Sequence, residues 1–136
     1  MKALIDTNII IDALQSRADF LEDAREIMLR IADYDGYITA NSISDIYYLQ
    51  HKFFHDKKRA RSNLADLLAI FGILDITSDD CHNALRSNIP DFEDAILVES
   101  ALRNKMDAIV TRNTKDFRNS PIKVYSPYEF LQVLNN

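Results

Sequence analysis

Residues 91–117, DFEDAILVESALRNKMDAIVTRNTKDF, contain the signals that decide the fold. A helix is predicted over residues 90–105, because proline suits the first helical turn and aspartate suits the N-cap. The apolar run at residues 108–111 then predicts a short buried strand. Asp94 lies in the first turn of this helix, and Asp116 lies just beyond the strand. The stretch therefore predicts a helix–strand unit with an acid near each end.

The same alternation of strands and helices extends over the rest of the chain. Short strands are predicted at residues 2–6, 37–39, 73–76, 108–111 and 122–125. Helices are predicted at residues 9–16, 19–34, 42 to about 55, 59–71, 78–88, 90–105 and from 127 onward. Parallel strands need crossover connections long enough to carry a helix. We therefore predict an α/β fold, a three-layer α/β/α sandwich with a central parallel sheet of about five strands.

Composition agrees with one domain that spans residues 1–136. The chain is 47% hydrophobic, and its 2 glycines and 3 prolines leave little material for the hairpins of an antiparallel barrel. Cys81 is the only cysteine, so no intramolecular disulfide can form and a reducing cytoplasm is the expected compartment. Asp6 and Asn8 interrupt the apolar N-terminus too early for a signal peptide, and no membrane insertion is expected.

Four aspartates are expected at one edge of the sheet. Asp6 ends the first strand, Asp45 lies beyond the second, Asp116 lies beyond the fourth, and Asp94 lies in the helix that leads into the fourth. In open parallel sheets, sites form outside the carboxyl ends of the strands. Helix capping is the alternative, because Ser42–Asp45, Asp91–Asp94 and Asn113–Asp116 all have the spacing of a capping box.

The chemistry that suits such a cluster is metal-dependent phosphodiester hydrolysis. An acid at the end of a buried strand, as predicted for Asp6, is costly unless it is paired or bound to a metal, and four neighbouring acids repel one another without a cation. Mg²⁺ or Mn²⁺ takes oxygen ligands, keeps several waters and needs few carboxylates. Two such cations would bring the formal net charge from −5 to −1, so an acidic composition does not exclude a nucleic-acid substrate.

Several motifs resemble the PIN domain family of metal-dependent ribonucleases, especially the VapC-like toxins of type II toxin–antitoxin pairs. The matching pieces are LIDTNIIIDAL, ITANSISDIYYL, DFEDAILVESALRNKMDAIVTRNTKDF and VYSPYEFL, which together span nearly the whole chain. The resemblance implies that Asp6, Asp45, Asp94 and Asp116 are the catalytic acids and metal ligands. It further implies supporting roles for Asn8, Thr111 and Asp91, and Asp91 is an alternative to Asp94 as the third acid.

The same resemblance implies an endoribonuclease that cleaves RNA, uses Mg²⁺ or Mn²⁺ and is restrained by a cognate antitoxin. A homodimer is also implied. The chain departs from the family pattern at Asp45, where many members carry glutamate. The shorter side chain reaches less far, so the choice between one metal and two stays open.

Basic residues give a second set of candidates, for contacts with the RNA backbone. Lys57, Lys58, Arg59 and Arg61 cluster near Phe53 and Phe54, and Arg112 lies next to the predicted acidic edge. Such residues can contact phosphates, although a solvated corner between two helices explains the cluster equally well. The paired His51 and His55 lack the further ligands of a zinc site. Tyr47, Tyr48, Phe53 and Phe54 suit either the core or a partner interface.

Two other function classes compete with the nuclease. A non-catalytic interaction module would keep the fold and use the acidic edge for partner contacts. An aspartyl phosphatase of the haloacid-dehalogenase type would also place an aspartate after the first strand. That enzyme needs a second aspartate two residues later as acid and base, and the position is Asn8 here.

Overall fold

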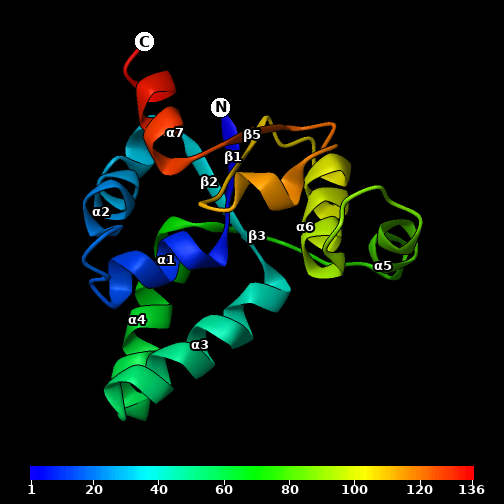
Figure 1. Ribbon diagram of the computed structural model, residues 1–136. Coiled ribbons are helices and arrows are strands. Elements are labelled where there is room, and N and C mark those ends of the chain that lie inside the picture. The colour runs from blue at the N-terminus through cyan, green and yellow to red at the C-terminus, as the bar shows by residue number, and fades with distance from the viewer.

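The computed structural model describes residues 1–136 and contains a five-stranded sheet in the order β3-β2-β1-β4-β5, with every neighbouring pair parallel (Figure 1). The strands are β1 Lys2–Ile5, β2 Asp35–Thr39, β3 Gly72–Leu74, β4 Ala108–Val110 and β5 Lys123–Tyr125. The helices are α1 Thr7–Leu14, α2 Leu21–Leu29, α3 Ala40–Phe54, α4 Lys57–Ile70, α5 Ser78–Leu85, α6 Phe92–Arg103 and α7 Pro127–Leu134, with 3₁₀ turns η1 Ile31–Asp33 and η2 Thr114–Phe117. The predicted α/β class is confirmed.

Two apolar cores lie on opposite faces of the sheet. Side chains alternate along a strand, so Ala3 and Ile5 face one core while Leu4 faces the other. The first core receives α1, α2, α3, α4 and α7, and the second receives α5 and α6. This arrangement is the predicted three-layer sandwich. None of the helices has both the length and the apolar composition needed to cross a membrane.

The carboxyl ends of β1 and β4 lie side by side at the centre of the sheet. Ile5 is in register with Val110, and the backbone N–H of Asp6 donates to the Val110 carbonyl oxygen at 2.9 Å. The Thr111 N–H donates in turn to the Tyr125 carbonyl oxygen at 2.9 Å. These bonds extend the ladder one residue past each strand and hold the first residues of the edge in place.

Two predicted helices end three or more residues before their predicted C-terminal ends. The pattern at residues 19–34 predicts one helix, but α2 ends at Leu29 and a separate turn, η1, follows. Arg30 lies at the break between α2 and η1. Its guanidinium donates hydrogen bonds to Asp33, to Asn135 and to the Leu134 carbonyl oxygen. The helix expected to run to Asn88 ends at Leu85. In both cases tertiary contacts or turn geometry stop a helix that the apolar pattern would continue.

Candidate metal-dependent active site

Asp6 lies between the end of β1 and the first turn of α1, where it is the N-cap. One carboxylate oxygen accepts the Thr7 N–H at 2.8 Å, and the other accepts the Thr111 hydroxyl at 2.8 Å and the Asn8 amide at 3.3 Å. Burial raises the pKa of Asp6, the Thr111 and Thr7 hydrogen bonds and the Arg112 charge oppose this, and the Asp116 charge adds to it. The sequence predicted this helix from residue 9, and α1 begins two residues earlier, at Thr7.

Asp94 lies in the first turn of α6, as the sequence predicts, and its backbone N–H donates to the N-cap carboxylate of Asp91 at 3.0 Å. Burial, and then the neighbouring charges of Asp91, Asp6 and Asp116, raise the pKa of Asp94 to about 7. Carboxylates from β1, α6 and η2 are therefore close enough to disfavour one another's ionisation.

Three of the four predicted acids line one cavity of about 420 Å³: Asp6, Asp45 and Asp94. Asp116 lies outside the lining, on η2, and reaches the cavity through its charge, which acts on both Asp6 and Asp94. The other lining residues are Thr7, Asn8, Ile11, Arg17, Asn41, Ser42, Tyr48, Leu49, Glu93, Leu97 and Asn113. The cavity opens at the carboxyl edge of the sheet, where α1, α3 and α6 begin.

Asp45 is exposed and lies in the second turn of α3. The predicted capping box at Ser42–Asp45 is absent, because α3 begins at Ala40 with Thr39 as its N-cap. The Ser42 hydroxyl is buried and bonds the Thr39 hydroxyl at 2.7 Å. Asp45 is therefore free of a capping role and faces the cavity from its α3 wall.

Asn8, Thr111 and Asp91 support the acids. Thr111 is fully buried, and its hydroxyl donates to Asp6 while accepting the Asn113 N–H at 3.1 Å. Asn8 donates to Asp6, but its buried Oδ1 has no hydrogen-bond partner. Asp91 caps α6, and its charge helps to raise the pKa of Asp94. An unpaired buried oxygen at the rim of an acidic cavity marks a polar ligand position.

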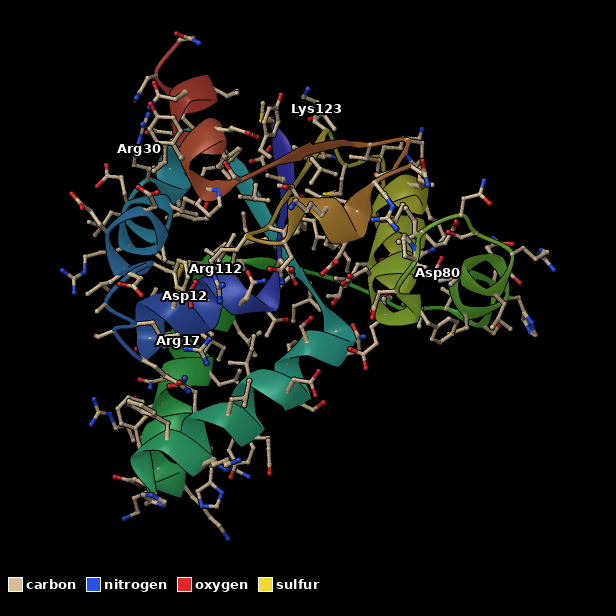
Figure 2. All side chains as sticks on the ribbon, in the orientation of Figure 1. Asp12, Arg17, Arg30, Asp80, Arg112 and Lys123 are labelled. Carbon is tan, nitrogen blue, oxygen red and sulfur yellow. The ribbon has the colours of Figure 1, made fainter.

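Arg112, the predicted phosphate contact, forms an ion pair with an acid that sequence reasoning missed. Its Nε donates to Oδ2 of Asp12 at 2.6 Å, and its Nη2 donates to Oδ1 at 3.3 Å. The guanidinium also stacks over the Phe20 ring at 3.9 Å. Asp12 is almost fully buried within α1 and lies beside both Arg112 and Arg17 (Figure 2). A role of Arg112 in phosphate binding stays a prediction.

The other predicted basic residues lie elsewhere. Lys57, Lys58, Arg59 and Arg61 are exposed on the first turns of α4, and none lines the cavity. Arg59 stacks over the Phe54 ring at 3.7 Å. This corner lies where α3 turns into α4, at the end of α3 remote from the acids (Figure 1).

Arg17, Glu93, Asn41 and Asn113 line the cavity although sequence reasoning did not single them out. Glu93 precedes Asp94 in the motif DFEDA, and Asn113 follows Thr111 and Arg112 in the TRN segment. Their closeness to predicted site residues could have identified both from the sequence. Arg17 lies in the connection between α1 and α2 and carries no motif. Its position follows only from the turn that ends α1.

The donors of this site fit a hard divalent cation. They are carboxylate, amide and hydroxyl oxygens, and the cavity contains no imidazole or thiol. As placed, no three of the acidic, histidine or cysteine side chains lie close enough to hold a metal ion together. Mg²⁺ needs only one or two carboxylates because water and substrate phosphates complete its shell. Burial, and after it repulsion by neighbouring acids, raises the pKa values of Asp6 and Asp94, and a cation would relieve the repulsion.

Residues 2–115 match the sequence model of the PIN domain. The chain belongs to the PIN domain family. Its fold also matches chains of several solved structures. A toxin–antitoxin complex from Klebsiella pneumoniae superposes with a TM-score of 0.70 at 29% identity, covering 93% of this chain and 98% of that one. VapBC2 from Rickettsia felis bound to a promoter DNA fragment superposes with a TM-score of 0.68 at 19% identity, and the match covers 93% of this chain and 98% of that one.

FitAcB from Neisseria gonorrhoeae gives a TM-score of 0.69 at 19% identity, with 93% of this chain and 98% of that chain covered. No curated protein matches the chain in sequence. The PIN domain assignment therefore rests on the family model, and the similar structures agree with it in fold. The model match ends at residue 115, so β5 and α7 lie beyond it and Asp116 lies at its boundary.

Proposed function

We propose that this PIN domain is an endoribonuclease that uses Mg²⁺ or Mn²⁺ to hydrolyse RNA phosphodiester bonds. The observation that carries the proposal is one cavity lined by Asp6, Asp94 and Asp45, with Asp116 on η2 close enough for its charge to act on Asp6 and Asp94. The mutual effect of these charges on the pKa values of Asp6 and Asp94 supports a cation-binding role. A site that serves structure alone would gain nothing from such repulsion.

In the proposed reaction, Asp6, Asp94 and Asp116 hold the metal, with Asp45 as a further or water-mediated ligand. A bound divalent cation supplies a lowered pKa for the attacking water and neutralises charge on the phosphate. Thr111, Asn8 and the Thr7 N–H fix the Asp6 carboxylate through the hydrogen bonds described above. Asp91 orients the first turn of α6 and thereby Asp94. The RNA backbone, away from the cleaved bond, is proposed to contact the exposed side chains of Lys57, Lys58, Arg59 and Arg61.

The proposal includes partners. The Klebsiella neighbour is a toxin–antitoxin complex, and the Rickettsia neighbour was solved as a VapBC pair on DNA. By analogy, we propose that this chain is the VapC-like toxin of such a pair, works in the cytoplasm and is restrained by a cognate antitoxin. A homodimer is proposed as the working unit. Leu68, Ile70 and Ile73, which are exposed on α4 and β3, supply apolar surface for such contacts.

A cleavage assay tests the proposal. Purified protein is incubated with structured and single-stranded RNAs in Mg²⁺, Mn²⁺ or EDTA, beside Asp6→Asn and Asp94→Asn. We expect cleavage that requires metal and falls by about 10²-fold or more in each variant, because an amide is a poor ligand for a hard cation. Asp107→Asn is the matched control, since its carboxylate accepts the Lys2 N–H at the opposite end of β1.

Circular dichroism must show that each variant is folded. Cleavage that persists in EDTA would contradict the metal mechanism. A folded protein that cleaves no RNA in either metal would favour the non-catalytic interaction module. Release of phosphate from an aryl phosphate would instead revive the phosphatase alternative.

A further inference from the structure

Arg17 is the only basic side chain in the lining of the acidic cavity. Its side chain is 43% exposed, so it remains in contact with water while it borders the site. The nearest acids of the cavity are proposed to hold a divalent cation, which would offset part of their negative charge, and Arg17 adds a positive charge at the border of the same cavity. A phosphate group of the substrate would contact the cation and the Arg17 guanidinium together.

The turn that ends α1 places Arg17 there. Ser16 has a φ of 51°, a left-handed conformation that terminates the helix after the C-cap Gln15. The Arg17 N–H then folds back and donates to the Asp12 carbonyl oxygen at 3.1 Å. This is the bond of a Schellman motif, so the backbone of Arg17 is fixed even though its side chain is half exposed.

The side chain of Arg17 keeps its hydrogen-bonding capacity. The one acid within reach, Asp12, already accepts two hydrogen bonds from Arg112, the shorter at 2.6 Å. Arg17 approaches the same carboxylate only as an ion pair at 3.5 Å and makes no side-chain hydrogen bond. Arg112 therefore neutralises Asp12, and the donors of Arg17 are available to a ligand (Figure 2).

Tyr48 lines the same cavity from α3 and is 61% exposed. The Gln15 side chain donates to the Leu49 carbonyl oxygen at 3.1 Å, which ties the end of α1 to the turn of α3 that carries Tyr48. Arg17 and Tyr48 thus belong to adjoining walls. An exposed aromatic ring and a guanidinium with open hydrogen-bond donors on the lining of one cavity offer one surface for a base and one group for a phosphate.

We infer that Arg17 and Tyr48 form a nucleotide-binding subsite next to the catalytic acids, in which Arg17 binds a backbone phosphate and Tyr48 stacks on a base of single-stranded RNA. The inference rests on the proposed function and extends it by naming two residues of the cavity lining that position the RNA. A stacked base must be unpaired, so duplex RNA is excluded from this subsite.

The test measures RNA binding directly, apart from cleavage. Fluorescence anisotropy of a labelled mixed-sequence single-stranded RNA is recorded with Ca²⁺, which binds carboxylates but holds its ligands in a looser geometry than Mg²⁺. The variants are Arg17→Gln, Arg17→Lys and Tyr48→Ala. The matched controls are Arg25→Gln, an exposed arginine on α2 outside the cavity, and Tyr128→Ala, 63% exposed on α7.

We expect Arg17→Gln to weaken binding about tenfold and to reduce the salt dependence by about one phosphate contact. Arg17→Lys should recover part of that loss. Tyr48→Ala should weaken binding about fivefold or more. On an abasic ribose-phosphate strand, Tyr48→Ala should have no effect, whereas Arg17→Gln should keep its full effect. The control variants should bind like the wild type.

Several results would overturn the inference. One is equal binding by the wild type and Arg17→Gln; another is a Tyr48→Ala loss that persists on the abasic strand, which would show packing rather than stacking. Absence of RNA binding by the wild type would overturn it together with the nuclease proposal. RNA binding without cleavage in Mg²⁺ or Mn²⁺ would contradict the nuclease proposal alone. The effects of the Arg17 and Tyr48 variants on binding would still decide whether the subsite exists.

Discussion

Aspartates in this chain behave differently according to the charges that face them. Asp12 and Asp80 are almost fully buried, and each is paired with an arginine, Arg112 and Arg103 respectively. Asp6 and Asp94 instead face other acids, and their pKa values are raised. The same residue type therefore stabilises the fold at two positions and, in the absence of a cation, opposes it at two others.

Replacement of Asp94 by asparagine should stabilise the metal-free protein. At pH 8 the Asp94 carboxyl is ionised, above its pKa of about 7, and its charge meets Asp91, Asp6 and Asp116. We expect Asp94→Asn to raise the free energy of unfolding by about 1 kcal/mol, after allowance for solvent screening. Urea unfolding in EDTA measures this. Addition of Mg²⁺ should raise the Tm of the wild type and leave that of the variant unchanged; an Mg²⁺ response in the variant would contradict a ligand role.

Replacement of Asp12 by asparagine should destabilise the protein whether or not a metal is present. The variant leaves Arg112 without its partner at the junction between β4 and η2, and loss of one member of a buried pair costs about 2 kcal/mol or more. Thermal or urea unfolding measures the loss. Asp33→Asn is the control, because the Arg30–Asp33 pair is exposed and should contribute little. Equal effects of the two changes would contradict a structural role for the buried pair.

Sequence could identify the acids but not their partners. Asp6, Asp94 and Asp116 follow or precede strands, and the topology of a parallel sheet places them together. Asp12 looked like one polar residue of an apolar helix, since nothing in IIIDAL reveals that Arg112 lies against it 100 residues later. Arg17 was missed for a similar reason. Pair contacts at long range depend on packing, which no local pattern encodes.

At the scale of elements, helices α5 and α6 are joined by a charged contact. Asp80 and Thr77 form a reciprocal capping box at the start of α5, and the Asp80 carboxylate also accepts two hydrogen bonds from Arg103 of α6, at 3.1 and 3.0 Å. Burial pushes the pKa of Asp80 upward, but the Arg103 and Thr77 hydrogen bonds outweigh it and hold the pKa below 3.8. The carboxylate is thus bound more firmly in the folded chain than in the unfolded one.

The pH dependence of this contact has a definite sign. Because the folded pKa of Asp80 is lowered, its stabilising effect is complete above the unfolded value of 3.8 and is lost as the pH falls through the folded value. Wild type should therefore exceed Asp80→Asn in stability at pH 6, and the difference should shrink below about pH 4. Urea unfolding across this range measures it, with Asp79→Asn as the exposed neighbouring control. A difference that is constant with pH would contradict the charged contact.

The start of α3 shows where element prediction failed. Ser42 and Asp45 have the spacing of a capping box, and the sequence therefore places the helix start at Ser42. In the structure the chain is already helical at Ala40, because β2 passes directly into α3 at Thr39. The hydroxyls of Thr39 and Ser42 bond each other across this junction. Without a loop between strand and helix, the local cap signal marks an interior position.

At the scale of the molecule, the alternation of strands and helices in the sequence predicted the class of fold. It did not predict the order of the strands in the sheet. Alternation requires crossovers and hence parallel pairing, which the structure confirms. The position of β1 at the centre, between β2 and β4, is a long-range property. It is also what gathers the acids, since the first strand can only meet the end of the fourth if the two are neighbours.

The central position of β1 also governs when the site comes into being during protein synthesis. Asp6 is synthesised well before its hydrogen-bond partner Thr111, which lies 105 residues later in the chain. A nascent chain that stops before β4 has the first acid and no strand to carry Thr111 and Asp116 to it. Translation past β4 and η2 must therefore precede assembly of the site, and a fragment that stops before β4 cannot form it.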